Sequence, residues 1–246
     1  MDYIPDIERA RIVLQNCSKK IAQRIRGKPL NPKEYSLQLG FGIATDWLGW
    51  AGSIDGISHS ILRRRKSERS ETLLELTRFM FLWTAANALF SRQDILSLFS
   101  VAQPKSELER FKMLYRQTAQ TRVEQDNSLK ILHNILKQPM EVTSFPWVPI
   151  KSPPTILEVI YQKYMQPPEQ KRAIGKMMLS SIQNSAYGQL DLPTLIYATR
   201  NWNVHGVLLS SSFRGTGKKF LLWVKTVGCE LTRALEGSGQ FVLSKI

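Results

Sequence analysis

Two side chains near the C-terminal end of the chain are suited to chemistry on a phosphate group: Arg200 and His205. The amides Asn201 and Asn203 lie between them. On a straight helix, five positions turn two residues about 140° apart. Arg200 and His205 can therefore address one phosphate if the long arginine reaches around the helix, or if the helix ends before His205. Asn201 and His205, at i and i+4, share one face.

These residue types fit cleavage of RNA without a metal ion. Imidazole ordinarily titrates at about 6.5, so His205 can accept or donate a proton near neutral pH. A base that removes the proton from a ribose 2′-OH lets that oxygen attack the adjacent phosphorus. Arg200 offers planar, bidentate donors for the charge that develops on the phosphoryl oxygens, and Asn201 would orient the imidazole or bind a phosphate oxygen. The same spacing also fits a histidine that caps a helix beside a surface arginine.

Charge and composition favour a polyanionic partner. The 246 residues include 34 Lys and Arg against 20 Asp and Glu, a formal net charge of +14, and a strongly basic chain suits nucleic acid. The presence of only two cysteines excludes a disulfide framework and a Cys-rich zinc site, and the three histidines disfavour a His-rich metal cage. We therefore expect no metal and no other cofactor.

No segment predicts a membrane protein. The longest apolar stretch, Phe79 to Phe90, is shorter than the roughly 20 residues of a membrane-spanning helix. The acidic N-terminus lacks the apolar region of a signal peptide. We expect a cytoplasmic protein without a membrane partner.

Apolar spacing predicts an all-α fold. We expect a bundle of four to five helices in residues 67–246, and an N-terminal helical extension of unknown role in residues 1–66. The capping-box signature Ser106–Glu109 begins a helix that runs toward Lys137, with a possible break near Asp126 and Asn127. Asp191-Leu192-Pro193 begins the helix that leads into Arg200. The other expected helices cover residues 5–26, 71–92, 155–165, 169–180, and 220 to Gly237.

Several segments leave two interpretations open. Residues 33–62, rich in glycine and tryptophan, fit short helices packed through small residues or an irregular aromatic loop. Arg63 to Lys66 fits a solvated linker or a strip that contacts phosphates. Asn87, within an apolar helix, should hydrogen-bond in the core or face a cavity. Gln240 to Leu243 is the one segment with some strand-like alternation.

A basic loop follows His205. Arg214, Lys218 and Lys219 would hold RNA backbone beside the site, or they belong to a solvated turn. A phosphate-binding loop is excluded, because Ser212 and Lys219 stand where that motif needs Gly and Ser or Thr. The tryptophans are predicted to lie in the core, except Trp202, whose place between Arg200 and His205 also permits base stacking.

The segment from Tyr197 to Gly206 (YATRNWNVHG) resembles the signature of the HEPN superfamily, in which Arg, often followed by Asn, precedes His after a short spacer. Residues 81–90 (FLWTAANALF) are similar to the earlier core helix of HEPN proteins, and the two segments occur in the expected order. The resemblance covers residues 70–236, and its specific part is much shorter.

The resemblance implies an α-helical bundle that dimerises, with the Arg–His motifs in a cleft between two protomers. Many HEPN proteins are metal-independent endoribonucleases of toxin–antitoxin, abortive-infection and CRISPR-associated defence. Carried over, Arg200 would bind phosphate, His205 would act as acid and base, and Asn201 would assist them, while Asn203 would contribute to substrate binding. Other members have lost catalysis and serve as adaptors or nucleotide binders.

We therefore expect a homodimeric endoribonuclease, a toxin or anti-phage defence effector whose partner is RNA. The alternatives are a non-catalytic nucleic-acid-binding module, or a HEPN-like interaction module that pairs with an antitoxin or a sensor. The sequence does not identify the RNA target or an activating signal.

Overall fold

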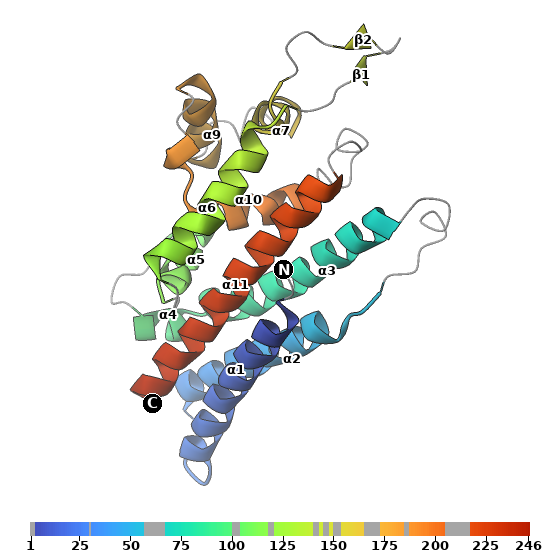
Figure 1. The fold of residues 1–246 in the computed structure, drawn as a ribbon. Coiled ribbons are helices and arrows are strands. Elements are labelled where there is room, and N and C mark those ends of the chain that lie inside the picture. Colours follow the sequence, from blue (N-terminus) through green and yellow to red (C-terminus); the bar gives the residue numbers. More distant parts are fainter. Residues whose placement is uncertain are drawn as a thin grey trace.

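A computed structural model describes residues 3–29, 31–56, 67–99, 104–117, 121–139, 143–144, 148–149, 154–164, 173–184, 187–204 and 217–246. These residues are almost entirely helical, which confirms the all-α class (Figure 1). Strand pairing within them is limited to β1 (Thr143–Ser144) and β2 (Val148–Pro149), which are antiparallel. The helices are α1 (Ile4–Ile25), α2 (Pro32–Ser53), α3 (Ser67–Phe90), α4 (Gln93–Phe99), α5 (Glu107–Tyr115), α6 (Arg122–Lys137), α7 (Ile156–Tyr164), α9 (Ala173–Gln183), the short 3₁₀ helix η2 (Tyr187–Gln189), α10 (Leu192–Val204) and α11 (Gly217–Lys245).

Four long helices, α1, α2, α3 and α11, pack along one another and hold much of the core (Figure 1). On its other sides α11 contacts α5, α6 and α10, and α7 and α9 follow beyond α6. The predicted division into residues 1–66 and 67–246 falls between helices of this one group, since α1 and α2 pack on α3 and α11. Helices α1 and α2 of the N-terminal segment thus pack directly on helices of the C-terminal segment.

Of residues 33–62, which the sequence left open, residues 33–53 belong to one continuous helix, α2, and residues 57–62 lie outside the described part of the chain. Asn31 caps it by accepting a hydrogen bond from the Lys33 backbone N–H, and Pro32 occupies the first turn. Glycine inside this helix permits close packing. A Cβ atom on Gly40 would lie 2.5 Å from Ile95 Cδ1 and 2.8 Å from Arg92 Cδ. The glycines therefore serve helix contacts here, and do not interrupt the helix.

The helix expected from Ser106 toward Lys137 is two helices. Its predicted capping box is present, with Ser106 and Glu109 hydrogen-bonded to each other's backbone N–H. However, α5 ends at Tyr115, and α6 begins with a second capping box between Thr121 and Glu124. The break predicted near Asp126 and Asn127 therefore falls inside α6, about one helical turn after its first residue, Arg122. The missed signal is the Thr121–Glu124 pair.

Helix α11 does not end at Gly237, and Gln240 to Leu243 are helical. The small residues of its last turns lie against α1: Cys17 Sγ is 3.3 Å from the Gly239 carbonyl oxygen. A Cβ atom on Gly239 would lie 2.6 Å from Val13 Cγ1 and 2.7 Å from Leu14 Cδ2. The close approach of two helices explains the glycine at position 239, and the helix stop predicted at Gly237 is wrong.

We expect Gly239→Ala to destabilise the protein by about 1–3 kcal/mol, the usual cost of overpacking a tight contact. The matched control is Gly52→Ala in α2, where a Cβ atom would lie 3.5 Å from Ile7 Cγ2, an ordinary contact distance. Chemical denaturation of both variants measures the free energy of unfolding. Equal free energies of unfolding for the two variants would contradict the prediction, because α1 and α11 would then move apart without loss of stability.

A buried ion pair ties three of the long helices together. Glu75 and Arg78, both on α3 and both almost fully buried, are paired with each other. The Tyr3 hydroxyl donates to Glu75 Oε2 at 2.9 Å, and burial together with that carboxylate raises the pKa of Tyr3. Arg78 also donates to the carbonyls of Ala51 (3.0 Å) and Ile54 (2.6 Å) at the end of α2. Every charge in this group thus has a partner.

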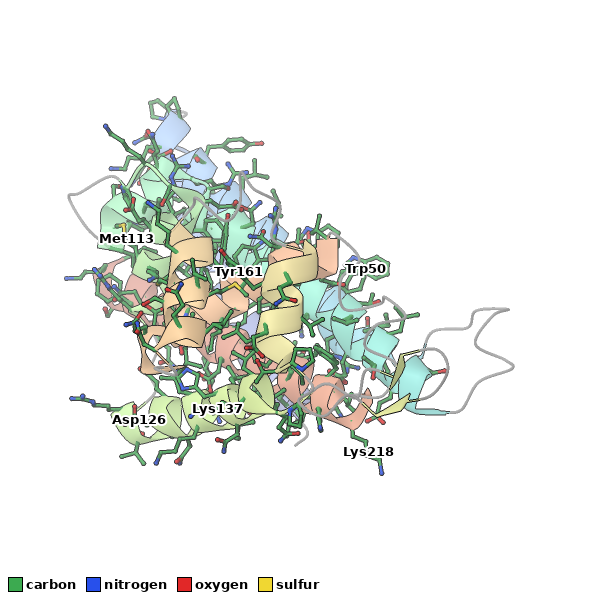
Figure 2. All side chains as sticks on the ribbon, turned by 90° about the horizontal axis from the view of Figure 1, so that it is seen from above. Trp50, Met113, Asp126, Lys137, Tyr161 and Lys218 are labelled. Atoms are coloured by element: carbon green, nitrogen blue, oxygen red, sulfur yellow. The ribbon has the colours of Figure 1, made fainter. Side chains whose placement is uncertain are left out.

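Two other expectations change. Asn87 is partly exposed, so the cost of a fully buried amide does not arise. Trp83, Trp202 and Trp223 are buried as predicted, but Trp50 is 63% exposed on α2 and extends from the surface (Figure 2). Trp202 packs on Trp223, with ring centroids 5.9 Å apart, which makes it a core residue in this structure.

Candidate functional site

The Arg200 segment forms the last turns of α10. Its predicted start is correct: Asp191 Oδ1 accepts a hydrogen bond from the Thr194 N–H at 2.9 Å. Burial opposes ionisation of Asp191, but hydrogen bonds from Lys112 and Thr194 lower its pKa below the ordinary value. The described part of this helix reaches Val204, and His205 lies outside the described residues.

Arg200 lies on the solvent side of α10. Its side chain is 31% exposed. Its Nη1 donates to Asn201 Oδ1 at 2.8 Å, so the predicted helper residue contacts the guanidinium directly. Its Nε is buried and has no hydrogen-bond partner among the described residues. The guanidinium is thus positioned by the protein without having all of its donors satisfied.

Helix α5 supplies the acidic side of the site. Glu107 Oε1 lies 4.0 Å from Arg200 Nη2, and Glu107 Oε2 accepts a hydrogen bond of 2.9 Å from the Tyr197 hydroxyl. Burial and this hydrogen bond raise the pKa of Tyr197. Farther along α5, Lys112 Nζ lies 2.7 Å from Asp191 Oδ2. Two polar links therefore hold α5 antiparallel to α10 and keep Glu107 beside Arg200.

Residues of the core also hold α10 in place. The rings of Trp83 and Tyr197 meet edge to face with centroids 5.7 Å apart, so the two segments of the HEPN resemblance are in contact. Thr199 Oγ1 accepts a hydrogen bond of 2.8 Å from Trp223 Nε1, which joins α10 to α11. The turns of α10 that carry Arg200 are therefore held in place by contacts with α3, α5 and α11.

Of the other predicted substrate-binding residues, the structure describes Asn203, Lys218 and Lys219. Asn203 Nδ2 is 3.5 Å from the Leu76 carbonyl oxygen, so its amide is directed toward α3 and not toward Arg200. Lys218 and Lys219 lie in the first turn of α11, about one turn before Trp223, which packs on α10. Lys218 is exposed and extends outward from the start of that helix (Figure 2).

Some predicted residues lie outside the part of the chain that the structure describes. They include the candidate acid and base, His205, and the candidate RNA contact Arg214. The basic run Arg63 to Lys66 also falls outside. Of the three proposed reactive residues, the structure thus places Arg200 and Asn201 together.

No group of three or more His, Cys, Asp or Glu side chains among the described residues is arranged to hold a metal ion. His133, the one histidine within them, is partly buried with Nε2 3.0 Å from the Leu190 carbonyl oxygen. Burial lowers its pKa. Within the same ranges, no helix combines the length and the apolar character needed to cross a bilayer.

Glu107 and Tyr197 are the site residues that the sequence analysis did not select. Tyr197 stands three positions before Arg200, a spacing that already predicts a shared helix face. Glu107 is distant in sequence, and its proximity to Arg200 depends on how α5 packs on α10. From the sequence, only the position of Glu107 in the first turn of a predicted helix, where acidic residues are favoured, could be recognised.

Comparisons with known proteins do not assign a family. No protein-family model matches the chain. No curated protein and no solved structure is significantly similar to it.

Proposed function

We propose that the protein is a metal-independent endoribonuclease of the HEPN type, with Arg200, Asn201 and His205 as its reactive group. The observation that carries the proposal is the setting of Arg200. Its guanidinium is partly exposed, is hydrogen-bonded to Asn201, and lies 4.0 Å from the Glu107 carboxylate in the last described turns of α10. The contact between Trp83 and Tyr197, which joins the two HEPN-like segments, supports the same proposal.

In this mechanism His205 removes the proton from a ribose 2′-OH, and the oxygen attacks the adjacent phosphorus. The 5′ oxygen leaves and takes up a proton, so the products are a 2′,3′-cyclic phosphate and a 5′-hydroxyl. Arg200 neutralises the charge on the phosphoryl oxygens in the transition state, which is where fixed donors contribute most to the rate. Asn201 keeps the guanidinium in position through its 2.8 Å hydrogen bond.

Glu107 holds Arg200 in the absence of RNA. Its carboxylate lies 4.0 Å from Arg200 Nη2 and is itself anchored by the Tyr197 hydroxyl. The Glu107 side chain is 38% exposed, so an arriving phosphate can share the guanidinium without first opening the core. The acid therefore positions the arginine and takes no part in proton transfer.

The proposal includes a homodimer whose two Arg–His motifs face one cleft, in a HEPN-like bundle of four to five helices. It also includes a cytoplasmic role as a toxin or defence effector, with an antitoxin or a sensor as a possible partner. These parts come from the resemblance. Mass measurement of the untagged protein in solution tests the dimer, and a monomer at all concentrations would remove the shared cleft.

The test is cleavage of single-stranded RNA in the presence of EDTA. Wild type is expected to cut, and His205→Ala is expected to lose roughly 10²–10⁴-fold in rate, the usual contribution of a general acid or base. His133→Ala is the matched control, because that histidine lies on α6 with its ring against Leu190. Products are identified by their cyclic phosphate ends.

Two results would contradict the proposal. Equal cutting by wild type and His205→Ala would exclude the catalytic assignment. Binding of RNA with no product from any RNA tried would instead favour the alternative, a non-catalytic binding or interaction module.

A further inference from the structure

We infer that the end of the molecule formed by the α1–α2 hairpin is a binding surface for the phosphodiester backbone of nucleic acid. This surface, named here the basic tip, consists of Lys19, Lys20, Arg24, Arg26 and Lys28. It is separate from Arg200 and does not depend on whether the protein cleaves RNA.

The charge of the basic tip is one-sided. From residue 9 to residue 33 the chain contains eight Lys and Arg and not a single Asp or Glu. Arg9 and Arg11, at the start of this stretch, are paired with Asp6 and Glu8. The five residues of the basic tip are all exposed, and in the described structure none of them forms an ion pair. Lys20 donates only to a neutral acceptor, the Leu243 carbonyl, at 3.4 Å.

The fold gathers further cations at this end. Helices α1 and α11 are parallel, since Tyr3 meets Gly228 and Lys20 meets Leu243. The last turn of α11 therefore brings the exposed Lys245 to the same end, and the antiparallel α2 begins there with the exposed Lys33 (Figure 1). Uncompensated charges of one sign held close together attract a polyanion and release its counterions on binding.

The side-chain composition of the basic tip favours nucleic acid over a lipid bilayer as its ligand. A helix that lies in a membrane surface presents large apolar side chains beside its cations. Among the described residues from 13 to 34 the exposed positions are polar, cationic or in the turn. The nearest exposed large hydrophobic residues, Ile12, Tyr35 and Leu39, lie on α1 and α2 outside the basic tip. Polar and cationic side chains alone suit contacts with phosphates in water.

The basic tip and Arg200 lie at different levels of α11. Trp223 packs on α10 near Arg200, whereas Lys20 contacts Leu243. Twenty residues of helix separate these two levels, which corresponds to roughly 30 Å. A nucleic acid held at the basic tip therefore engages a surface well away from Arg200.

The experiment compares two triple variants with the same change in net charge, from +14 to +11. The first is Lys19→Gln, Arg24→Gln and Arg26→Gln in the basic tip. The second, the control, is Arg122→Gln, Lys130→Gln and Lys176→Gln, which are exposed residues of α6 and α9. Both are made in the His205→Ala background, so that cleavage cannot consume the probe. Circular dichroism confirms that each variant is folded.

Affinity is measured by fluorescence anisotropy with one labelled single-stranded sequence, made as RNA and as DNA, at several salt concentrations. Each lost phosphate contact lowers the slope of log affinity against log salt by about 0.7 for a single strand. We expect the basic-tip variant to lose a slope of about 2 and roughly 10- to 100-fold in affinity at low salt. The control variant should keep nearly the same affinity and salt dependence as the His205→Ala parent.

Equal losses in both triple variants would overturn the inference, because net charge alone would then govern binding. So would unchanged binding in the basic-tip variant, or binding of anionic phosphatidylserine vesicles without binding of RNA or DNA. Loss of binding to both nucleic acids supports recognition of the shared backbone, whereas loss for RNA alone would contradict it, because the phosphate contacts are common to RNA and DNA. None of these outcomes depends on whether the parent protein cleaves RNA.

Discussion

Replacing Arg78 with methionine is expected to destabilise the protein by about 3–5 kcal/mol, the usual effect of removing one member of a buried ion pair. The substitution leaves the Glu75 carboxylate buried with the Tyr3 hydroxyl as its hydrogen-bond donor. It also removes the donors for the carbonyls of Ala51 and Ile54. Chemical denaturation followed by circular dichroism measures the free energy of unfolding.

A double-mutant cycle separates the charge effect from packing. Glu75→Gln keeps an acceptor for Tyr3, so Glu75→Gln combined with Arg78→Met should be more stable than Arg78→Met alone, because no unpaired charge stays buried. Additive effects of the two substitutions would contradict the assignment. The cycle also tests whether α1 depends on α3, since Tyr3 belongs to the segment that the sequence analysis treated as an extension.

The helices that sequence could predict are those with local signals. Ser106 and Asp191 lie in recognisable caps, and both caps are present in the structure. The α1 helix, predicted over residues 5–26, runs from Ile4 to Ile25 and is followed by Gly27 with a φ of +72°, a conformation that favours glycine. In these places a few neighbouring residues determine the structure by themselves.

The errors occur where packing between distant segments overrides a local signal. Gly237 was predicted to end a helix, and Gly40 lies in a segment for which an irregular loop stayed open, yet both are inside helices, and Gly40 and Gly239 lie at close contacts. A glycine that costs helix stability by propensity can be retained because another element needs its space. That requirement is invisible until the partner helix is known.

The same distinction applies to the site. Arg200 and Asn201 are neighbours in sequence, but adjacent helix positions do not face each other, so their hydrogen bond was not predicted; Asn201 was expected to orient the imidazole or bind a phosphate oxygen. Glu107 reaches Arg200 only because α5 packs antiparallel on α10, with Lys112 holding Asp191. The acidic partner of the proposed phosphate-binding residue is therefore a product of tertiary structure.

If Arg200 acts as proposed, Arg200→Lys should lose nearly as much activity as Arg200→Ala, about 10²–10³-fold in cleavage rate. Lysine keeps the positive charge but carries one ammonium group in place of the planar fork that binds a phosphate through two donors. It also cannot reproduce the present arrangement, in which Nη1 donates to Asn201 while Nη2 faces Glu107. Charge alone is thus expected to be insufficient.

The control for this last substitution is Arg122→Lys, an exposed residue at the start of α6 that should cleave as wild type does. Initial rates at saturating RNA separate the chemical step from binding, and unchanged denaturation curves exclude misfolding. Full activity of Arg200→Lys would mean that the site needs only a positive charge. That result would undermine the geometric argument, because the contacts of Nη1 and Nη2 would then have no part in stabilising the transition state.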